Sequence, residues 1–164
     1  MDDLDGRLID LFGTDPRIGV LEASRRLGVA RGTVQARLDK LSASGVITGW
    51  GPDLSPEALG YPVTAFLTLE IRQEPSQGGH DTVGAHLAGI PEVLEAHTIT
   101  GAGDMLARVV ARSNTDLQRV IDRVLEAPAI VRCSTVIALA TQVPYRVRPL
   151  ARAAVSDRPA TDPR

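Results

Sequence analysis

The sequence is poor in cysteine, in aromatic residues and in long apolar runs. Its 164 residues include one cysteine, Cys133, which cannot form a disulfide within the chain and favours a reducing compartment. No apolar run approaches the roughly 18 residues of a membrane span, and residues 1–5 are acidic without an apolar signal core, so we expect neither membrane insertion nor export. Only 3% of residues are aromatic, which argues against a stacking surface for single-stranded nucleic acid.

What the chain contains is enough apolar residues for a buried core, 43%, and an uneven distribution of charge. The net charge is −2, but residues 20–50 hold five basic side chains against two acidic ones, a net +3. Residues 51–144 hold six against eleven, and residues 145–164 hold five against two. A basic segment beside an acidic body favours contact between one part of the chain and a polyanion.

The first fifty residues predict a winged helix-turn-helix DNA-binding domain. Apolar residues at helical spacing predict helices over residues 4–12, 20–27 and 30–44. The turn at residues 28–30 is tight, which is typical of a helix-turn-helix whose second helix enters the major groove. Residues 46–50 then form a β-like segment, which predicts the wing.

The rest of the chain predicts a second domain with the ferredoxin-like order β-α-β-β-α-β. Residues 51–62 are rich in proline and glycine and predict a linker, and residues 63–144 predict the domain itself. The expected segments are a strand at 63–72, a helix around Val83 and Leu87, strands at 93–100 and 105–112, a helix at 115–126 and a strand at 130–143. The fold class is therefore α+β. Residues 145–164 are expected to be a C-terminal tail, with at least the last ten residues disordered.

An ordered set of segments over residues 4–143 resembles a known family. They are Leu4 to Ile9 with Asp15 to Ile18, Arg25 to Val29 followed by Val34 to Leu38, Gly45 to Trp50, and Glu95 to Asp104. These resemble the opening helix, the helix-turn-helix, the wing and the pocket-bordering loop of the leucine-responsive regulator/asparagine regulator (Lrp/AsnC, feast/famine) family of transcription factors. One difference is that the family commonly has serine before the recognition helix, where this chain has Ala30.

The resemblance implies a non-enzymatic, cytoplasmic, nucleoid-associated regulator without a cofactor. Its partners would be double-stranded DNA, an amino acid or similar small metabolite bound between C-terminal domains, and further copies of itself. A homodimer that assembles into a tetramer or octamer is expected. Two alternatives stay open: an architectural DNA-binding protein without an effector, and a tetrapyrrole-pathway decarboxylase of the same two-domain plan. The latter would need His, Tyr and Arg around its substrate, and the two tyrosines, Tyr61 and Tyr145, lie near segment ends.

The outward strip of the third helix carries the candidate DNA contacts. Small residues near its start let the helix sit deep in a groove, with cations placed for phosphates and Thr33 or Gln35 for base edges. Arg25 and Arg26 end the second helix, where cations also favour the helix dipole. The full set of candidates is Arg25, Arg26, Arg31, Gly32, Thr33, Gln35, Arg37 and Lys40. Arg37 lies near the buried face, so an ion pair with Asp10 or Asp39 is the alternative role for it.

The loop Gly101-Ala102-Gly103-Asp104 is the candidate effector site. Its glycines let backbone N–H groups approach a carboxylate, and Asp104 can hold an ammonium group, as an α-amino acid requires. A plain tight hairpin, with Asp104 bonded to backbone, is the alternative. The resemblance adds further candidates on neighbouring segments and from a partner subunit, namely Thr98, Thr100, Ser134, Thr135 and Val136.

No catalytic or metal-ligating set emerges. His80 and His86 are six positions apart and would point to different helix faces, and no cysteine or acid completes a tetrahedral site. Cys133 lies in an expected strand without a neighbouring His-and-acid arrangement, so we interpret it as a core residue.

Overall fold

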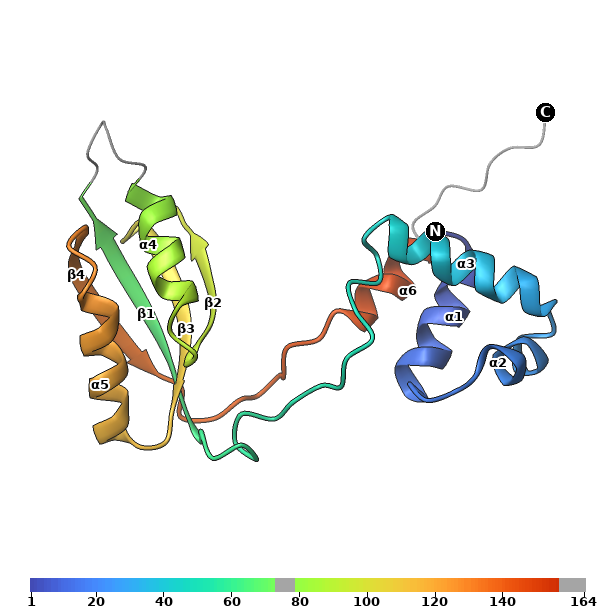
Figure 1. Ribbon diagram of the computed structural model, residues 1–164, viewed down its shortest axis with the longest axis horizontal. Helices are drawn as coiled ribbons and strands as arrows, with labels where there is room; N and C mark the ends of the chain where they lie inside the picture. Colours follow the sequence, from blue (N-terminus) through green and yellow to red (C-terminus); the bar gives the residue numbers. More distant parts are fainter. Residues whose placement is uncertain (73–78, 157–164) are drawn as a thin grey trace. The chain divides into compact units, whose positions relative to one another are not determined.

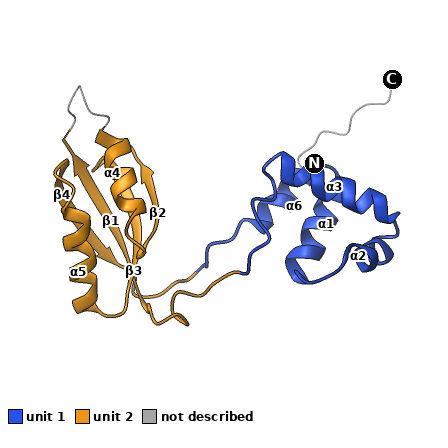
Figure 2. Cartoon of the chain, in the orientation of Figure 1, with its two compact units in different colours: residues 1–52, 143–164 blue, residues 53–142 orange. Residues whose placement is uncertain are grey.

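A computed structural model describes residues 1–72 and 79–156 of the chain, which form two compact units (Figures 1 and 2). The first unit comprises residues 1–52 and 143–164, and the second comprises residues 53–142. The chain therefore leaves the first unit, builds the second and returns to the first. The expected C-terminal disorder falls mainly on residues 157–164, outside the described residues.

The first unit contains four helices among the described residues: α1 (Asp3–Thr14), α2 (Val20–Leu27), α3 (Arg31–Ala43) and α6 (Arg148–Ser156). Leu8 of α1, Ala23 of α2 and Val34 of α3 are fully buried and meet in one apolar cluster with Ile18 and Leu38. The first three helices match the expected spans. Packing of their apolar faces, rather than helix propensity, holds segments this short in helical form.

Side chains and turns at the helix ends explain where two of these helices start and stop. The N-cap Asp2 accepts a hydrogen bond from the N–H of Asp5 (3.1 Å), and Asp5 accepts one from the N–H of Asp2 (3.0 Å), a reciprocal capping box at α1. Gly28 ends α2 with a positive φ of 69°, which glycine adopts at low cost. Ala30, before α3, offers no capping side chain, so α3 depends more on its neighbours.

The expected β-like wing at residues 46–50 is wrong in detail, because the structure has no strand there. The N–H groups of Val46 and Ile47 both donate to the carbonyl of Leu41, which wraps the chain around the end of α3. Trp50 then packs edge-to-face on Phe12 of α1, with ring centroids 5.6 Å apart. Among the described residues of the first unit there is no strand with which this segment could pair.

The C-terminal tail also differs from expectation. Residues 148–156 form α6, which packs on α1 within the first unit. The Nε of Arg152 donates to both carboxylate oxygens of Asp10, at 3.0 and 2.8 Å. Leu150, Ala151, Ala154 and Val155 have helical spacing, but the prolines of residues 144–163 favoured a tail in the sequence analysis. Contact with α1 then stabilises this short helix.

The second unit is a four-stranded antiparallel sheet with two helices on one face (Figure 1). Its elements are β1 (Val63–Ile71), α4 (Gly79–Ala88), β2 (Val93–Thr98), β3 (Met105–Ala111), α5 (Asn114–Leu125) and β4 (Ile130–Ile137), and the strand order is β2-β3-β1-β4. This confirms the ferredoxin-like order. The last strand ends at Ile137 rather than at 143, because β1 begins at Val63 and offers no partner further on.

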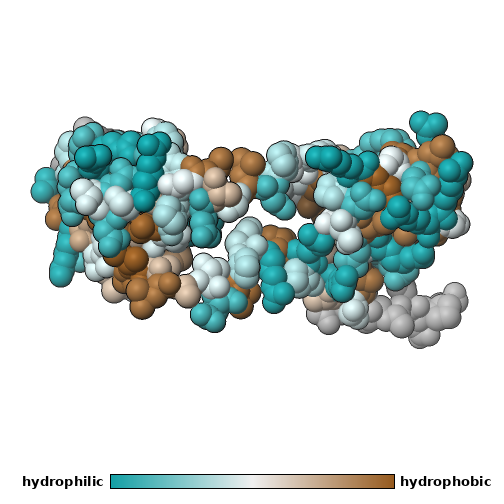
Figure 3. Space-filling model, turned by 90° about the horizontal axis from the view of Figure 1, so that it is seen from below, coloured by the Kyte–Doolittle hydropathy of each residue, from teal (hydrophilic) through white to brown (hydrophobic). Residues whose placement is uncertain are grey.

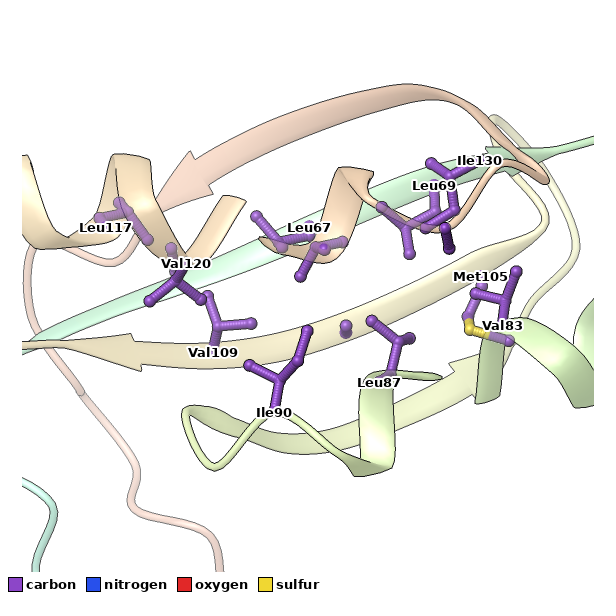
Figure 4. Packing of buried hydrophobic residues seen from close by; sticks show 14 of the residues in the cluster. Leu67, Leu69, Val83, Leu87, Ile90, Met105, Val109, Leu117, Val120 and Ile130 are labelled. Carbon is purple, nitrogen blue, oxygen red and sulfur yellow. The ribbon is translucent and has the colours of Figure 1, made fainter. Parts of the chain in front are cut away.

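The core of the second unit lies between the sheet and its two helices. Leu67 and Leu69 of β1 and Val109 of β3 face Val83 of α4 and Val120 of α5, and all five are fully buried (Figure 4). Full burial of such a side chain stabilises the fold by about 1.5–3 kcal/mol. No described helix of this unit covers the opposite face of the sheet, and Phe66, Arg108 and Val136 share that face by strand register.

Candidate DNA-reading helix and effector loop

The outward face of α3 is exposed, as a DNA-reading helix requires. Arg31, Gly32, Thr33, Gln35 and Lys40 are all exposed, while the apolar positions of the helix face the core. Gln35 is not wholly free, because its Nε2 donates to Oδ1 of Asp39 (2.8 Å). Within residues 1–72 and 79–156, Arg31 and Lys40 have no ion-pair partner, so their charges are available to a ligand.

Arg37 occupies a different position from the other candidates. It bonds the carboxylates of Asp2 and Asp5, the latter at 2.9 Å, and Asp5 is buried. The sequence left open an ion pair with Asp10 or Asp39. An ion pair is present, but Asp10 binds Arg152 and Asp39 binds Gln35.

Electrostatics agree with this pairing of Arg37. Its hydrogen bond lowers the pKa of the Asp2 carboxyl below its ordinary value. The hydrogen bonds to Asp2 and then to Asp5 raise the pKa of Arg37 in turn. Arg37 therefore joins α3 to the start of α1. The capping-box spacing of Asp2 and Asp5 was the sequence signal that could have revealed these partners.

The two arginines at the end of α2 are exposed but lie within ion pairs. Arg25 lies 3.7 Å from Glu22, and Arg26 lies 3.2 Å from Glu22 and 3.6 Å from Asp15. Exposed pairs of this kind contribute little stability, about 0–1 kcal/mol, and they break readily in favour of a phosphate. The helix-dipole role and the phosphate role for these arginines remain compatible.

The effector loop lies between β2 and β3 and is tied to the end of β1. The N–H of Asp104 donates to the carbonyl of Leu69 (2.9 Å), and Oδ2 of Asp104 accepts from the N–H of Ile71 (2.7 Å). The alternative role of Asp104, a bond to backbone, is therefore present, and it occupies one carboxylate oxygen. The other oxygen has no hydrogen-bond donor within the described part of the chain.

The two glycines of the loop have different reasons to be glycine. Gly101 has a positive φ of 118° and open space around its Cα, which suits close approach of a ligand. Gly103 packs on β1 instead: a Cβ there would lie 2.5 Å from Cγ2 of Thr68. Thr68 therefore borders the loop, and only its spacing within the strand marked it in the sequence.

The remaining effector candidates are distributed over both faces of the sheet. Ser134 pairs with Thr68 on the helix-free face, and Val136 follows on the same face. Thr135 pairs with Leu67 and so points to the opposite side. Thr100 and Ala102 are exposed in the loop, whereas Thr98 lines a shallow pocket of about 320 Å³ between α4 and β2. The structure thus brings the loop and Ser134 to the two sides of Thr68 and does not place Thr135 with them.

The described residues, 1–72 and 79–156, contain no group of three histidine, cysteine, aspartate or glutamate side chains arranged for a metal ion. His86 is engaged instead by the carbonyl of Arg123, 2.8 Å from its Nε2. In the same part of the chain, no helix has both the length and the hydropathy needed to cross a bilayer.

Comparison with known proteins identifies both units. Residues 1–42 match the AsnC-type helix-turn-helix domain, and residues 64–147 match the Lrp/AsnC ligand binding domain. The HTH-type transcriptional regulator FL11 of Pyrococcus horikoshii is 30% identical over 141 residues, which cover 86% of this chain and 91% of that protein. The regulatory protein AsnC of Escherichia coli is 29% identical over 150 residues, covering 91% and 97%.

Solved structures agree with these matches. The structure of E. coli AsnC superposes with a TM-score of 0.81 at 29% identity, covering 91% of this chain and 99% of that one. A feast or famine regulatory protein from M. tuberculosis, complexed with L-methionine, gives 0.77 at 28%, covering 89% and 97%.

A helix-turn-helix joined to a ligand-binding α+β domain defines a DNA-binding transcriptional regulator. The chain belongs to the Lrp/AsnC family.

Proposed function

We propose that the protein is a sequence-specific transcriptional regulator that responds to an amino acid or similar small metabolite bound by its second unit. The observation that carries DNA reading is the exposed face of α3, where Arg31 and Lys40 have no ion-pair partner within residues 1–72 and 79–156. Cations bind phosphates and fix the register of the helix, while Thr33 and Gln35 reach base edges in the major groove. We place this activity in the cytoplasm, at the nucleoid.

Amino-acid sensing is supported by the loop and by a relative. The open space at Gly101 leaves room for the carboxylate of an α-amino acid, and the second oxygen of Asp104 is available for its ammonium group. A relative 28% identical to this chain was solved with L-methionine. An α-amino acid carries its ammonium and carboxylate groups on the same carbon. A site for it therefore needs an anion-binding group beside a cation-binding group, as the loop backbone at Gly101 and the Asp104 carboxylate provide.

The proposal includes self-association as a homodimer, with further assembly into a tetramer or octamer. The face of the sheet without helices exposes Phe66 (36%) and Val136 (64%), and apolar surface is visible on this unit in Figure 3. Burying such surface against a second copy is favourable. An amino acid bound between subunits would favour one arrangement of the dimers, and that arrangement sets the spacing of their α3 helices on DNA.

The test of DNA reading is fluorescence anisotropy with labelled duplexes selected from genomic fragments, at several salt concentrations. The logarithm of the affinity should fall linearly with the logarithm of salt, and Lys40→Ala should reduce the slope by about 1, as loss of one phosphate contact requires. Arg119→Ala, an exposed arginine on α5, is the matched control and should leave the slope unchanged. Duplex binding that is absent or insensitive to salt would refute the proposal.

The test of sensing is a thermal-shift screen against the twenty amino acids. A ligand at about 100 times its dissociation constant stabilises the bound unit by about 2.7 kcal/mol, which is easily measured as a shift in Tm. If no amino acid shifts the Tm while duplex binding persists, the protein is an architectural DNA-binding protein instead.

A further inference from the structure

Helix α6 lies outside both regions that match the family. The helix-turn-helix match ends at residue 42 and the ligand-binding match ends at residue 147, whereas α6 spans Arg148–Ser156. Nothing in either match assigns a role to this helix. At nine residues it is too short to be stably helical in water by itself, so its contacts within the first unit maintain it.

Helices α6 and α1 touch along matching stripes that run in opposite directions. Arg152 binds Asp10, a Cβ at Gly6 would lie 3.1 Å from Cγ2 of Val155, and a Cβ at Gly13 would lie 2.7 Å from Cδ of Arg148. The α1 positions are i, i+4 and i+7, which share one helix face, and the α6 positions have the same spacing. The two glycines let the helices approach closely, and the ion pair lies between them.

The start of α1 is hydrogen-bonded to α3, the recognition helix. Asp2 and Asp5 both bond Arg37, which is the contact of α3 with the capping box of α1. The N-cap of α3, Ala30, supplies no capping side chain, so this contact with α1 is a principal polar restraint on α3. Helix α1 therefore contacts α6 through one set of residues and α3 through another.

We propose that α6 positions the recognition helix through α1, with Arg152 and Arg37 as positioning residues rather than DNA contacts. Undocking of α6 frees α1 to shift, and α3 shifts with it because Arg37 is bonded to Asp2 and Asp5. DNA affinity then falls although no group that touches DNA has been removed. The inference rests on the proposed function only in that α3 reads DNA.

The decisive experiment compares two truncated chains and one full-length variant. A chain of residues 1–147 lacks α6, and a chain of residues 1–156 keeps α6 and is the matched control. Val155→Asp in the full-length chain places a charge against Gly6 and disrupts docking without shortening the protein. Duplex affinity is measured by anisotropy over a range of salt, and Trp50, the single tryptophan of the chain, reports whether the first unit is folded.

We expect the 1–147 chain and Val155→Asp to bind the duplex about 2- to 30-fold more weakly than the 1–156 chain, the range typical of mutations that act through intervening contacts. Their salt slopes should match that of the wild type, because every phosphate contact remains, whereas Lys40→Ala lowers the slope. A general loss of folding would instead abolish the thermal unfolding transition that Trp50 fluorescence follows. The affinities are therefore compared at a temperature below that transition.

Equal affinity of the 1–147 and 1–156 chains would overturn the inference, as would a reduced salt slope in Val155→Asp. If the 1–147 chain does not fold, Val155→Asp decides: weaker binding with an intact Trp50 transition supports the inference, and unchanged binding overturns it. Failure of the proposed function looks different, because the wild type itself would then not bind duplex DNA.

Discussion

Replacing Asp5 with alanine should destabilise the first unit far more than its position near the chain start suggests. The side chain is 3% exposed, accepts a hydrogen bond from the N–H of Asp2 at 3.0 Å and from Arg37 at 2.9 Å. Loss of the capping contribution costs about 0.5–2 kcal/mol. Loss of a hydrogen bond to a charged group costs about 1.5–3 kcal/mol, at the lower end here because Asp2 still binds Arg37.

Together these losses amount to about 2–4 kcal/mol. For a domain of this size, each kcal/mol shifts the midpoint by about 4–8 °C, so the Tm of the first unit should fall by about 8–32 °C. Thermal unfolding followed by Trp50 fluorescence measures it, because Trp50 packs on Phe12 of α1.

Asp3→Ala is the matched control, because Asp3 lies in the same first turn of α1 but takes no part in these contacts. Its carboxylate is 83% exposed and lies 4.0 Å from Arg7, so its removal should shift the Tm by no more than a few degrees. If Asp5→Ala and Asp3→Ala shifted the midpoint equally, the buried contact between Arg37 and the start of α1 would not be what holds these helices together.

Three further outcomes follow from the structure. Gly103→Ala should destabilise the second unit by about 1–3 kcal/mol in urea unfolding followed by circular dichroism, because its Cβ would lie 2.5 Å from Cγ2 of Thr68. Arg37 lowers the pKa of Asp2 in the folded state, so this pair stabilises the protein above about pH 3.8, and the contribution disappears as pH falls through the lowered pKa. In Arg37→Gln, the urea concentration at the unfolding midpoint, followed by Trp50 fluorescence, should therefore decrease less on acidification than in the wild type. Burial raises the pKa of Cys133, so its reaction with a thiol reagent at pH 8 should be slower in the folded chain than in urea.

Helices α1 to α3 and the element order of the second unit could be predicted because these elements bury regular apolar faces. Leu4 and Leu8 of α1 are four positions apart, as are Val34 and Leu38 of α3, and alternate residues of β1 enter the core. These signals are local, and the structure preserves them with small changes at the element ends.

The features that could not be predicted depend on contacts between distant parts of the chain. Arg152 and Asp10 are 142 positions apart, so no local pattern indicates that α6 docks on α1. The wing was expected from β-prone residues 46–50, but a strand needs a neighbour to pair with, and the described part of the first unit contains none. Arg37 was placed near the buried face correctly, yet its partners lie 32 and 35 positions away.

The return of the chain to its first unit changes what a single backbone cut would do. A protease that cleaves once within the exposed residues 57–60 separates α1, α2 and α3 from the sheet along the backbone. The amino-terminal piece would nevertheless stay attached, because α6 belongs to the other piece and remains docked on α1. Such a nicked protein should migrate as one particle in native gels. It should separate into two fragments only when denaturant unfolds the packed helices α1 and α6.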